Sequence, residues 1–154
     1  MSLNAIREAI LGLLANRDHS QHEVVKKLTA KGYSSDEINS LILEFIQNRW
    51  IDDRRFTENY ILKRRNKGYG PYRINIELRA FGISDELIAE NLQIADNLWL
   101  TEIQKVWQKR FKGEQAEHYK NRAKQIRFLQ YRGFTSEQIN SVIDHPEFDQ
   151  DAMK

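Results

Sequence analysis

Residues 26–38 read KKLTAKGYSSDEI, and two later stretches of the chain repeat this pattern. They are IELRAFGISDELI at 76–88 and IRFLQYRGFTSEQI at 126–139. Each has a leucine, then a glycine that is followed by an apolar or aromatic residue and a hydroxyl residue. The shared glycines are Gly32, Gly82 and Gly133, which recur after 50 and 51 residues. A period of this length is typical of tandem helical repeats.

The repeated segment predicts one helix, a glycine stop and the start of the next helix. Glycine tolerates the left-handed backbone that closes a helix, and a serine or threonine oxygen accepts hydrogen bonds from the first amides of the following one. Ser34 and Thr135 are followed three residues later by Glu37 and Gln138. This spacing predicts a capping box at both helix starts, whereas Leu87 in the middle repeat predicts none there.

Apolar residues at helical spacing predict three helices in every repeat. In the first repeat the three apolar stripes cover residues 6–14, 24–28 and 38–46, and no stretch of the chain alternates like a strand. We therefore predict an all-α protein of three tandem three-helix repeats that form an elongated, curved array. The predicted domains are 1–50, 51–97 with the central motif, 98–145, and a frayed acidic tail at 146–154.

The composition limits the classes of function. The 154 residues include no cysteine, which excludes thiol catalysis and cysteine-ligated zinc. No apolar run approaches membrane length, and the start of the chain has no signal-peptide pattern. His19 and His22 lie three residues apart, but no carboxylate completes a metal site with them. We expect a soluble, cytoplasmic, monomeric protein that is not an enzyme and has no cofactor.

Charge alternates along the chain although the net charge is only +2. Residues 49–81 carry nine basic and four acidic side chains, and residues 105–132 carry nine basic and two acidic ones. Between them, residues 82–104 carry five acidic and no basic side chains. A single basic cluster can be a solvated surface, but two clusters separated by an acidic block favour a binding surface.

The basic turn at residues 64–75 reads RRNKGYGPYRIN and raises the question of a phosphate loop. A phosphate loop would need a preceding strand and a lysine followed by serine or threonine. We interpret Gly68 as the end of one helix and Gly70 as the cap of the next, with Pro71 at its first position. Tyr69 and Tyr72 could stack on bases, although packing between helices is the commoner use of such residues.

The basic residues around this turn and in the third repeat are the candidate binding residues. They could hold phosphate or carboxylate groups. The last helix of each repeat is acidic, which argues against a helix–turn–helix reader of the DNA major groove. The candidates for binding a partner or DNA are Arg55, Lys63, Arg64, Arg65, Lys67, Arg73, Lys120, Lys124 and Arg127.

Residues 51–84, IDDRRFTENYILKRRNKGYGPYRINIELRAFGIS, resemble the bacterial RecX family of regulators of the RecA recombinase. NRDHSQHEVVKKL in the first repeat and RFLQYRGFTSEQI in the third also resemble that family. The positions that match the central motif are Asp52, Asp53, Arg55, Phe56, Lys67, Gly68, Gly70, Pro71, Arg73, Glu77 and Leu78. Arg49, Trp50 and Phe81 depart from the usual pattern of the family.

The resemblance implies a non-enzymatic protein of tandem three-helix repeats that lies in the helical groove of the RecA filament on DNA. There it would inhibit ATP hydrolysis and strand exchange, promote filament disassembly, and so modulate DNA repair, recombination and the SOS response. The alternative is a nucleic-acid-binding helical module that has no sequence preference and no recombinase partner. A third reading is a helical scaffold for another protein.

Overall fold

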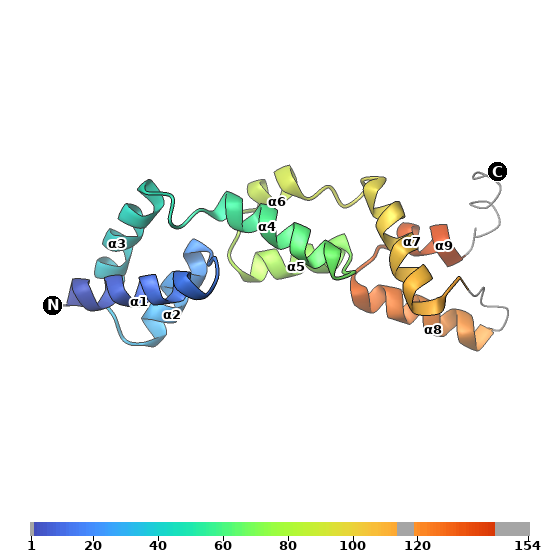
Figure 1. The fold of residues 1–154 in the computed structure, drawn as a ribbon, viewed down its shortest axis with the longest axis horizontal. Coiled ribbons are helices and arrows are strands. Elements are labelled where there is room, and N and C mark those ends of the chain that lie inside the picture. The colour runs from blue at the N-terminus through green and yellow to red at the C-terminus, as the bar shows by residue number, and fades with distance from the viewer. Residues whose placement is uncertain (1, 114–118, 144–154) are drawn as a thin grey trace. The chain divides into compact units, whose positions relative to one another are not determined.

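The computed structural model describes residues 2–113 and 119–143, with the side chains of 3–113 and 121–143 (Figure 1). Within these ranges the chain forms nine α-helices and no strand, which confirms the predicted all-helical fold. The helices are α1 (Ser2–Asn16), α2 (Gln21–Ala30), α3 (Ser35–Gln47), α4 (Asp53–Asn66), α5 (Pro71–Ala80), α6 (Asp85–Asn91), α7 (Leu98–Phe111), α8 (Tyr119–Arg132) and α9 (Ser136–Ile143). The predicted acidic tail, 146–154, lies outside the described residues.

None of the described helices combines the length and the apolar character that crossing a bilayer would require. The elongated, curved arrangement and the boundaries of the predicted domains stay predictions.

The packing of the chain divides it into two compact units. Among the described residues, the first unit comprises 2–60 and 78–91, and the second unit comprises 61–77, 92–113 and 119–143. The division falls inside α4 and inside α5, so each of these helices contributes residues to both units.

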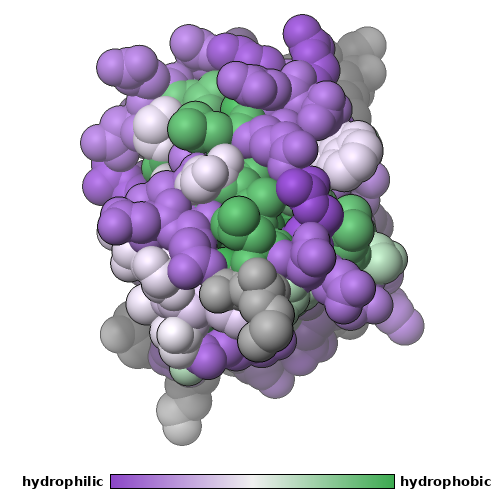
Figure 2. Space-filling view, turned by 90° about the vertical axis from the view of Figure 1, so that its left-hand side faces the viewer, coloured by the Kyte–Doolittle hydropathy of each residue, from purple (hydrophilic) through white to green (hydrophobic). Residues whose placement is uncertain are grey.

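The core of the first unit is the apolar side that α1, α2 and α3 share. Its buried residues include Ile6, Ile10, Val24, Leu28, Ile38, Leu41, Ile42 and Phe45. Burying a side chain of this size stabilises the fold by about 1.5–3 kcal/mol. Figure 2 also shows apolar side chains exposed among hydrophilic ones on the face at the left-hand end of Figure 1.

The core of the second unit includes two buried tryptophans of α7. Trp99 and Trp107 are 2% and 5% exposed. Their indole N–H groups donate to the Gln93 carbonyl and to the Gln125 side-chain oxygen, each at 3.1 Å. A buried indole needs such a partner, and both rings can therefore fill the core without leaving a polar group unsatisfied.

The predicted helix caps are confirmed at two helix starts and wrong at a third. The Thr135 amide donates to Gln138 Oε1 at 2.9 Å and the Gln138 amide donates to Thr135 Oγ1 at 3.2 Å, which completes the predicted capping box. Ser84 accepts from the Leu87 amide at 3.2 Å without a box, as expected. The predicted box at Ser34 does not form, because the Ser34 side chain makes no capping bond and one buried oxygen of Glu37 has no hydrogen-bond partner among the described residues.

A glycine at the end of one helix meets the start of another helix in both units. In the first unit, Ser20 Oγ donates to the Phe81 carbonyl at 2.6 Å, and a Cβ added to Gly82 would overlap His22. We call this contact, and its counterpart in the second unit, the glycine junction.

In the second unit, the Gly70 amide donates to the Arg132 carbonyl at 2.7 Å, and the Tyr72 amide donates to the Gly133 carbonyl at 2.9 Å. A Cβ on Gly70 would overlap the Gly133 backbone. The start of α5 at Pro71 confirms that Gly70 precedes that helix, and Gly68, with φ +90°, closes α4 as predicted. The glycine at position 70 is thus needed for close backbone contact as well as for the helix start.

His19 of the first unit is a buried titratable residue whose pKa is lowered by its surroundings. The residue is 3% exposed, its Nδ1 donates to the Arg17 carbonyl at 3.0 Å, and its Nε2 accepts from the Lys27 ammonium at 2.9 Å. Burial lowers the pKa of His19, the Arg17 and Lys27 cations act in the same direction, and the bond to the carbonyl and the Glu23 carboxylate oppose them.

Because the pKa of His19 is lower in the folded chain than in the unfolded chain, the unfolded chain takes up the proton first as the pH falls. We therefore expect the contribution of His19 to lower the free energy of unfolding as the pH falls through and below 6.5, the ordinary pKa of histidine. Thermal unfolding at pH 7.5 and 5.5 should show a smaller drop in Tm for His19→Gln than for the wild type. An equal drop in both proteins would exclude His19 as the source.

Candidate partner-binding site

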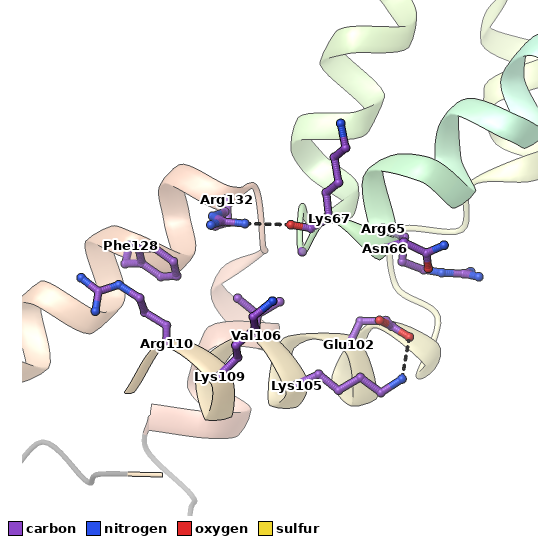
Figure 3. A pocket seen from close by; sticks show the side chains of 11 residues that line it. Arg65, Asn66, Lys67, Glu102, Lys105, Val106, Lys109, Arg110, Phe128 and Arg132 are labelled. Atoms are coloured by element: carbon purple, nitrogen blue, oxygen red, sulfur yellow. Dashed lines mark hydrogen bonds and ion pairs between the residues drawn. The ribbon is translucent and has the colours of Figure 1, made fainter. Parts of the chain in front are cut away.

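A hollow of about 440 Å³ in the second unit collects basic side chains from three helices (Figure 3). We call it the basic hollow. Among the residues that the structure describes, Glu102 is its one acidic lining residue, and Val106 and Phe128 line its apolar part. The described residues that line it include six basic ones, Arg65, Lys67, Lys105, Lys109, Arg110 and Arg132.

Local sequence explains why positive charge gathers here. Arg65 lies in the last turn of α4, where a cation is favoured by the negative end of the helix dipole. Lys105 and Lys109 are four residues apart on α7, so they lie on the same face of that helix. Glu102 lies 3.5 Å from the Lys105 ammonium, whose side chain is 69% exposed. Within the described residues, one carboxylate faces six basic lining residues, and the basic hollow therefore favours an anionic partner.

Stacking on aromatic rings holds two of these arginines in place. The Arg132 guanidinium lies 4.9 Å from the Tyr69 ring centre and 5.0 Å from that of Phe128, and it donates to the Lys67 carbonyl at 3.0 Å. Arg110 lies 5.4 Å from the Phe128 ring centre. Guanidinium groups held this way lose little further freedom when they bind an anion.

Two other arginines of the second unit are paired within the chain. Arg64 forms a bidentate pair with Glu77 at 2.9 and 2.8 Å, and Arg73 donates to the same carboxylate at 3.2 Å. Both guanidinium groups lie over Tyr69, at 3.8 and 4.6 Å from its ring centre. These contacts join α4 to α5.

Comparison with known proteins identifies the family of the chain. It is 38% identical to the regulatory protein RecX of Vibrio vulnificus (strain CMCP6) over 137 residues. The aligned residues make up 89% of this chain and 90% of that protein. The chain belongs to the RecX family. It is also 33% identical to the regulatory protein RecX of Pseudomonas entomophila (strain L48), over 90% of each protein.

The three-helix domains of RecX match the chain in tandem, the first at residues 7–44, the second at 52–92 and the third at 100–143. The crystal structure of RecX from Lactobacillus salivarius shares the fold, with a TM-score of 0.74 and 22% identity over 96% of this chain and 97% of that chain. As a member of the RecX family, the chain is a regulatory protein that modulates RecA, and it is not an enzyme.

The RecX fold brings only some of the predicted binding residues together. Arg65 and Lys67 line the basic hollow, whereas Arg64 and Arg73 pair with Glu77. Arg55 belongs to the first unit, where it donates to the Arg49 carbonyl at 2.8 Å. The exposed residues Lys63, Lys124 and Arg127 are not among those that line the basic hollow, and the side chain of Lys120 lies outside the described residues.

Four basic residues of the hollow were absent from the sequence prediction, namely Lys105, Lys109, Arg110 and Arg132. All four belong to the second basic block, residues 105–132, and that charge run was the signal that could have indicated them. Their approach to the end of α4 depends on packing within the second unit, which the local pattern does not encode.

The pair between Arg64 and Glu77 gives a prediction about stability. Both side chains are about four-fifths shielded from solvent, with 18% and 21% exposed. Arg64→Ala removes one partner of a charged hydrogen-bonded pair, which costs about 2 kcal/mol in the free energy of unfolding. Urea unfolding followed by circular dichroism measures it. Lys63→Ala is the matched control, because Lys63 is exposed on the same helix and has no ion pair with a described residue. Similar losses in both variants would contradict a structural role for Arg64.

Proposed function

We propose that the basic hollow is the site through which this RecX-family regulator binds the RecA filament on DNA. The observation that supports this is that six basic residues, and one acidic residue among the residues that the structure describes, line the same hollow. Cations presented in this way suit either an acidic surface of RecA or the phosphates of the DNA that the filament holds. Lys63 on α4 and Lys124 and Arg127 on α8 are further exposed cations of the second unit.

Binding of this kind inhibits RecA by restraining its motion. A regulator that bridges adjacent RecA protomers opposes the rearrangements that accompany ATP turnover, and so it slows hydrolysis and strand exchange. The inhibition needs no catalytic group on the regulator, only a fixed set of contacts.

The acidic last helices argue against a function in which the protein reads the base sequence of DNA. The last helix of the middle repeat, α6, carries Asp85, Glu86 and Glu90 and no basic residue. DNA phosphates would repel it from the major groove, so contact with DNA runs through phosphate and without reading base sequence.

Titration of the purified protein into RecA that hydrolyses ATP on single-stranded DNA tests the proposal. We expect the rate to fall at less than equimolar regulator, with no comparable effect on an unrelated DNA-dependent ATPase. Equal inhibition of both enzymes would instead indicate a nucleic-acid-binding module that competes for DNA. Such a module should bind DNA without RecA, with an affinity that falls steeply with salt.

A further inference from the structure

Tyr131 is the most exposed large apolar or aromatic side chain in the described part of the chain. It is 70% exposed, in the last turn of α8. The next residue, Arg132, lines the basic hollow. An aromatic ring exposed to this degree gains little from packing, so the fold of the second unit does not explain why it is there.

One face of the Tyr131 ring is supported by a fixed cation. The Arg73 guanidinium lies 4.9 Å from the ring centre and donates to the Tyr131 carbonyl at 3.0 Å. Its second contact, to Glu77 at 3.2 Å, keeps Arg73 in this position. Because Tyr131 is 70% exposed and, within the described residues, Arg73 is the one cation over its ring, we infer that the other face of the ring is accessible to a ligand.

The two neighbouring tyrosines do not share this arrangement. Tyr69 lies under three guanidinium groups, those of Arg64, Arg73 and Arg132, at 3.8, 4.6 and 4.9 Å, so it acts as a packing residue. Tyr72 is 57% exposed and, within the described part of the chain, has no cation over its ring. Tyr131 therefore differs from both, since it has one supported face and one open face.

We propose that Tyr131 is a stacking platform for an unpaired base of a nucleic-acid single strand whose phosphates lie in the basic hollow. Proteins that bind single strands without sequence preference combine a cationic surface with aromatic rings on which bases stack. The bases of a duplex are already stacked on one another, so only an unpaired base can use the open face of Tyr131. This inference rests on the proposed phosphate contact at the same site.

Comparing the binding of an oligonucleotide that has bases with one that lacks them separates the contribution of base stacking from the contribution of phosphate charge. The probes are a fluorescent 12-nucleotide oligothymidine strand and a strand of equal length made of abasic sites, which carries the same phosphates. We expect the wild-type protein, without RecA, to bind the thymidine strand ~10-fold more tightly, because base stacking contributes about 1–3 kcal/mol per base.

Tyr131→Ala should bind both strands with the affinity that the wild type has for the abasic strand. Tyr131→Phe should keep the preference because it keeps the ring. Tyr72→Ala is the matched control, and it should also keep the preference. The dependence of abasic-strand binding on salt should be the same in all four proteins, since their phosphate contacts are unchanged.

Equal binding of the two strands by the wild type, or an undiminished preference in Tyr131→Ala, would overturn the inference. Inhibition of RecA is a separate readout. If the wild type inhibits RecA but shows no preference for bases, only this inference fails; if it prefers bases but does not inhibit RecA, only the proposed function fails.

Discussion

A variant in which Arg65, Lys67 and Lys109 are all replaced by glutamate should lose inhibition of RecA. The three changes reverse the charge of three of the six basic residues that, in the described part of the chain, line the basic hollow. Each contact between unit charges is worth about 1 kcal/mol in water and more where solvent is excluded, so we expect the concentration for half-inhibition to rise about 100-fold or more. The rate of ATP hydrolysis by RecA at increasing concentrations of the variant measures the effect.

The control for this variant carries the same change of charge elsewhere. Lys26, Lys31 and Arg79 are exposed in the first unit, and glutamate at these three positions should leave inhibition within a few-fold of the wild type. Arg64 is left unchanged in both proteins because its pair with Glu77 supports the fold. Equal loss of inhibition in the two triple variants would show that net charge, and not the basic hollow, controls binding.

Alanine at Gly133 should destabilise the chain more than alanine at Gly32, although the backbone conformations of the two glycines are alike. Their φ angles are +97° and +93°. A left-handed backbone costs any non-glycine residue about 1–2 kcal/mol, and this cost applies to both variants. At Gly133 the new Cβ would also overlap Arg73, whereas nothing lies within 4 Å of a Cβ at Gly32. Overpacking of this kind adds about 1–3 kcal/mol.

Urea unfolding of Gly133→Ala and Gly32→Ala gives the loss in free energy of unfolding of each variant. The difference between the two losses is the cost of the overlap at the glycine junction. Gly82→Ala should resemble Gly133→Ala, because its Cβ would overlap His22 across the equivalent junction of the first unit. If all three variants lose the same stability, the cost is conformational only, and the glycine junction makes no contribution of its own.

The helices could be predicted from the sequence because their signals are local. The spacing of apolar residues and the recurring glycines indicated three helices per repeat, and Gly68 and Pro71 marked the end of α4 and the start of α5 correctly. The capping box at Ser34 failed although its sequence pattern was right. A capping box depends on side-chain orientation as well as residue type, and the half-buried Glu37 does not reach the backbone of Ser34.

The candidate site could be predicted only in part, because its charges come from distant segments. Arg65 and Lys67 were indicated by the basic turn, but Lys105 and Lys109 reach them only through the packing of α7. Arg73 had the right charge and position in the sequence, yet its contacts with Glu77 and Tyr131 could be seen only in the structure. Charge alone therefore did not separate cations that face solvent from cations that hold helices together.

Site-specific crosslinking to RecA tests most directly whether the basic hollow faces the filament. The chain has no cysteine, so a single introduced cysteine can carry a photoreactive crosslinker without competing sites. Asn66→Cys places it in the lining of the basic hollow without removing a charge, and Asn140→Cys places it on the exposed side of α9 as the control. We predict that RecA filaments on single-stranded DNA crosslink to position 66 and not to position 140. Crosslinking from position 140 without any from position 66 would contradict the assignment of the basic hollow as the binding site.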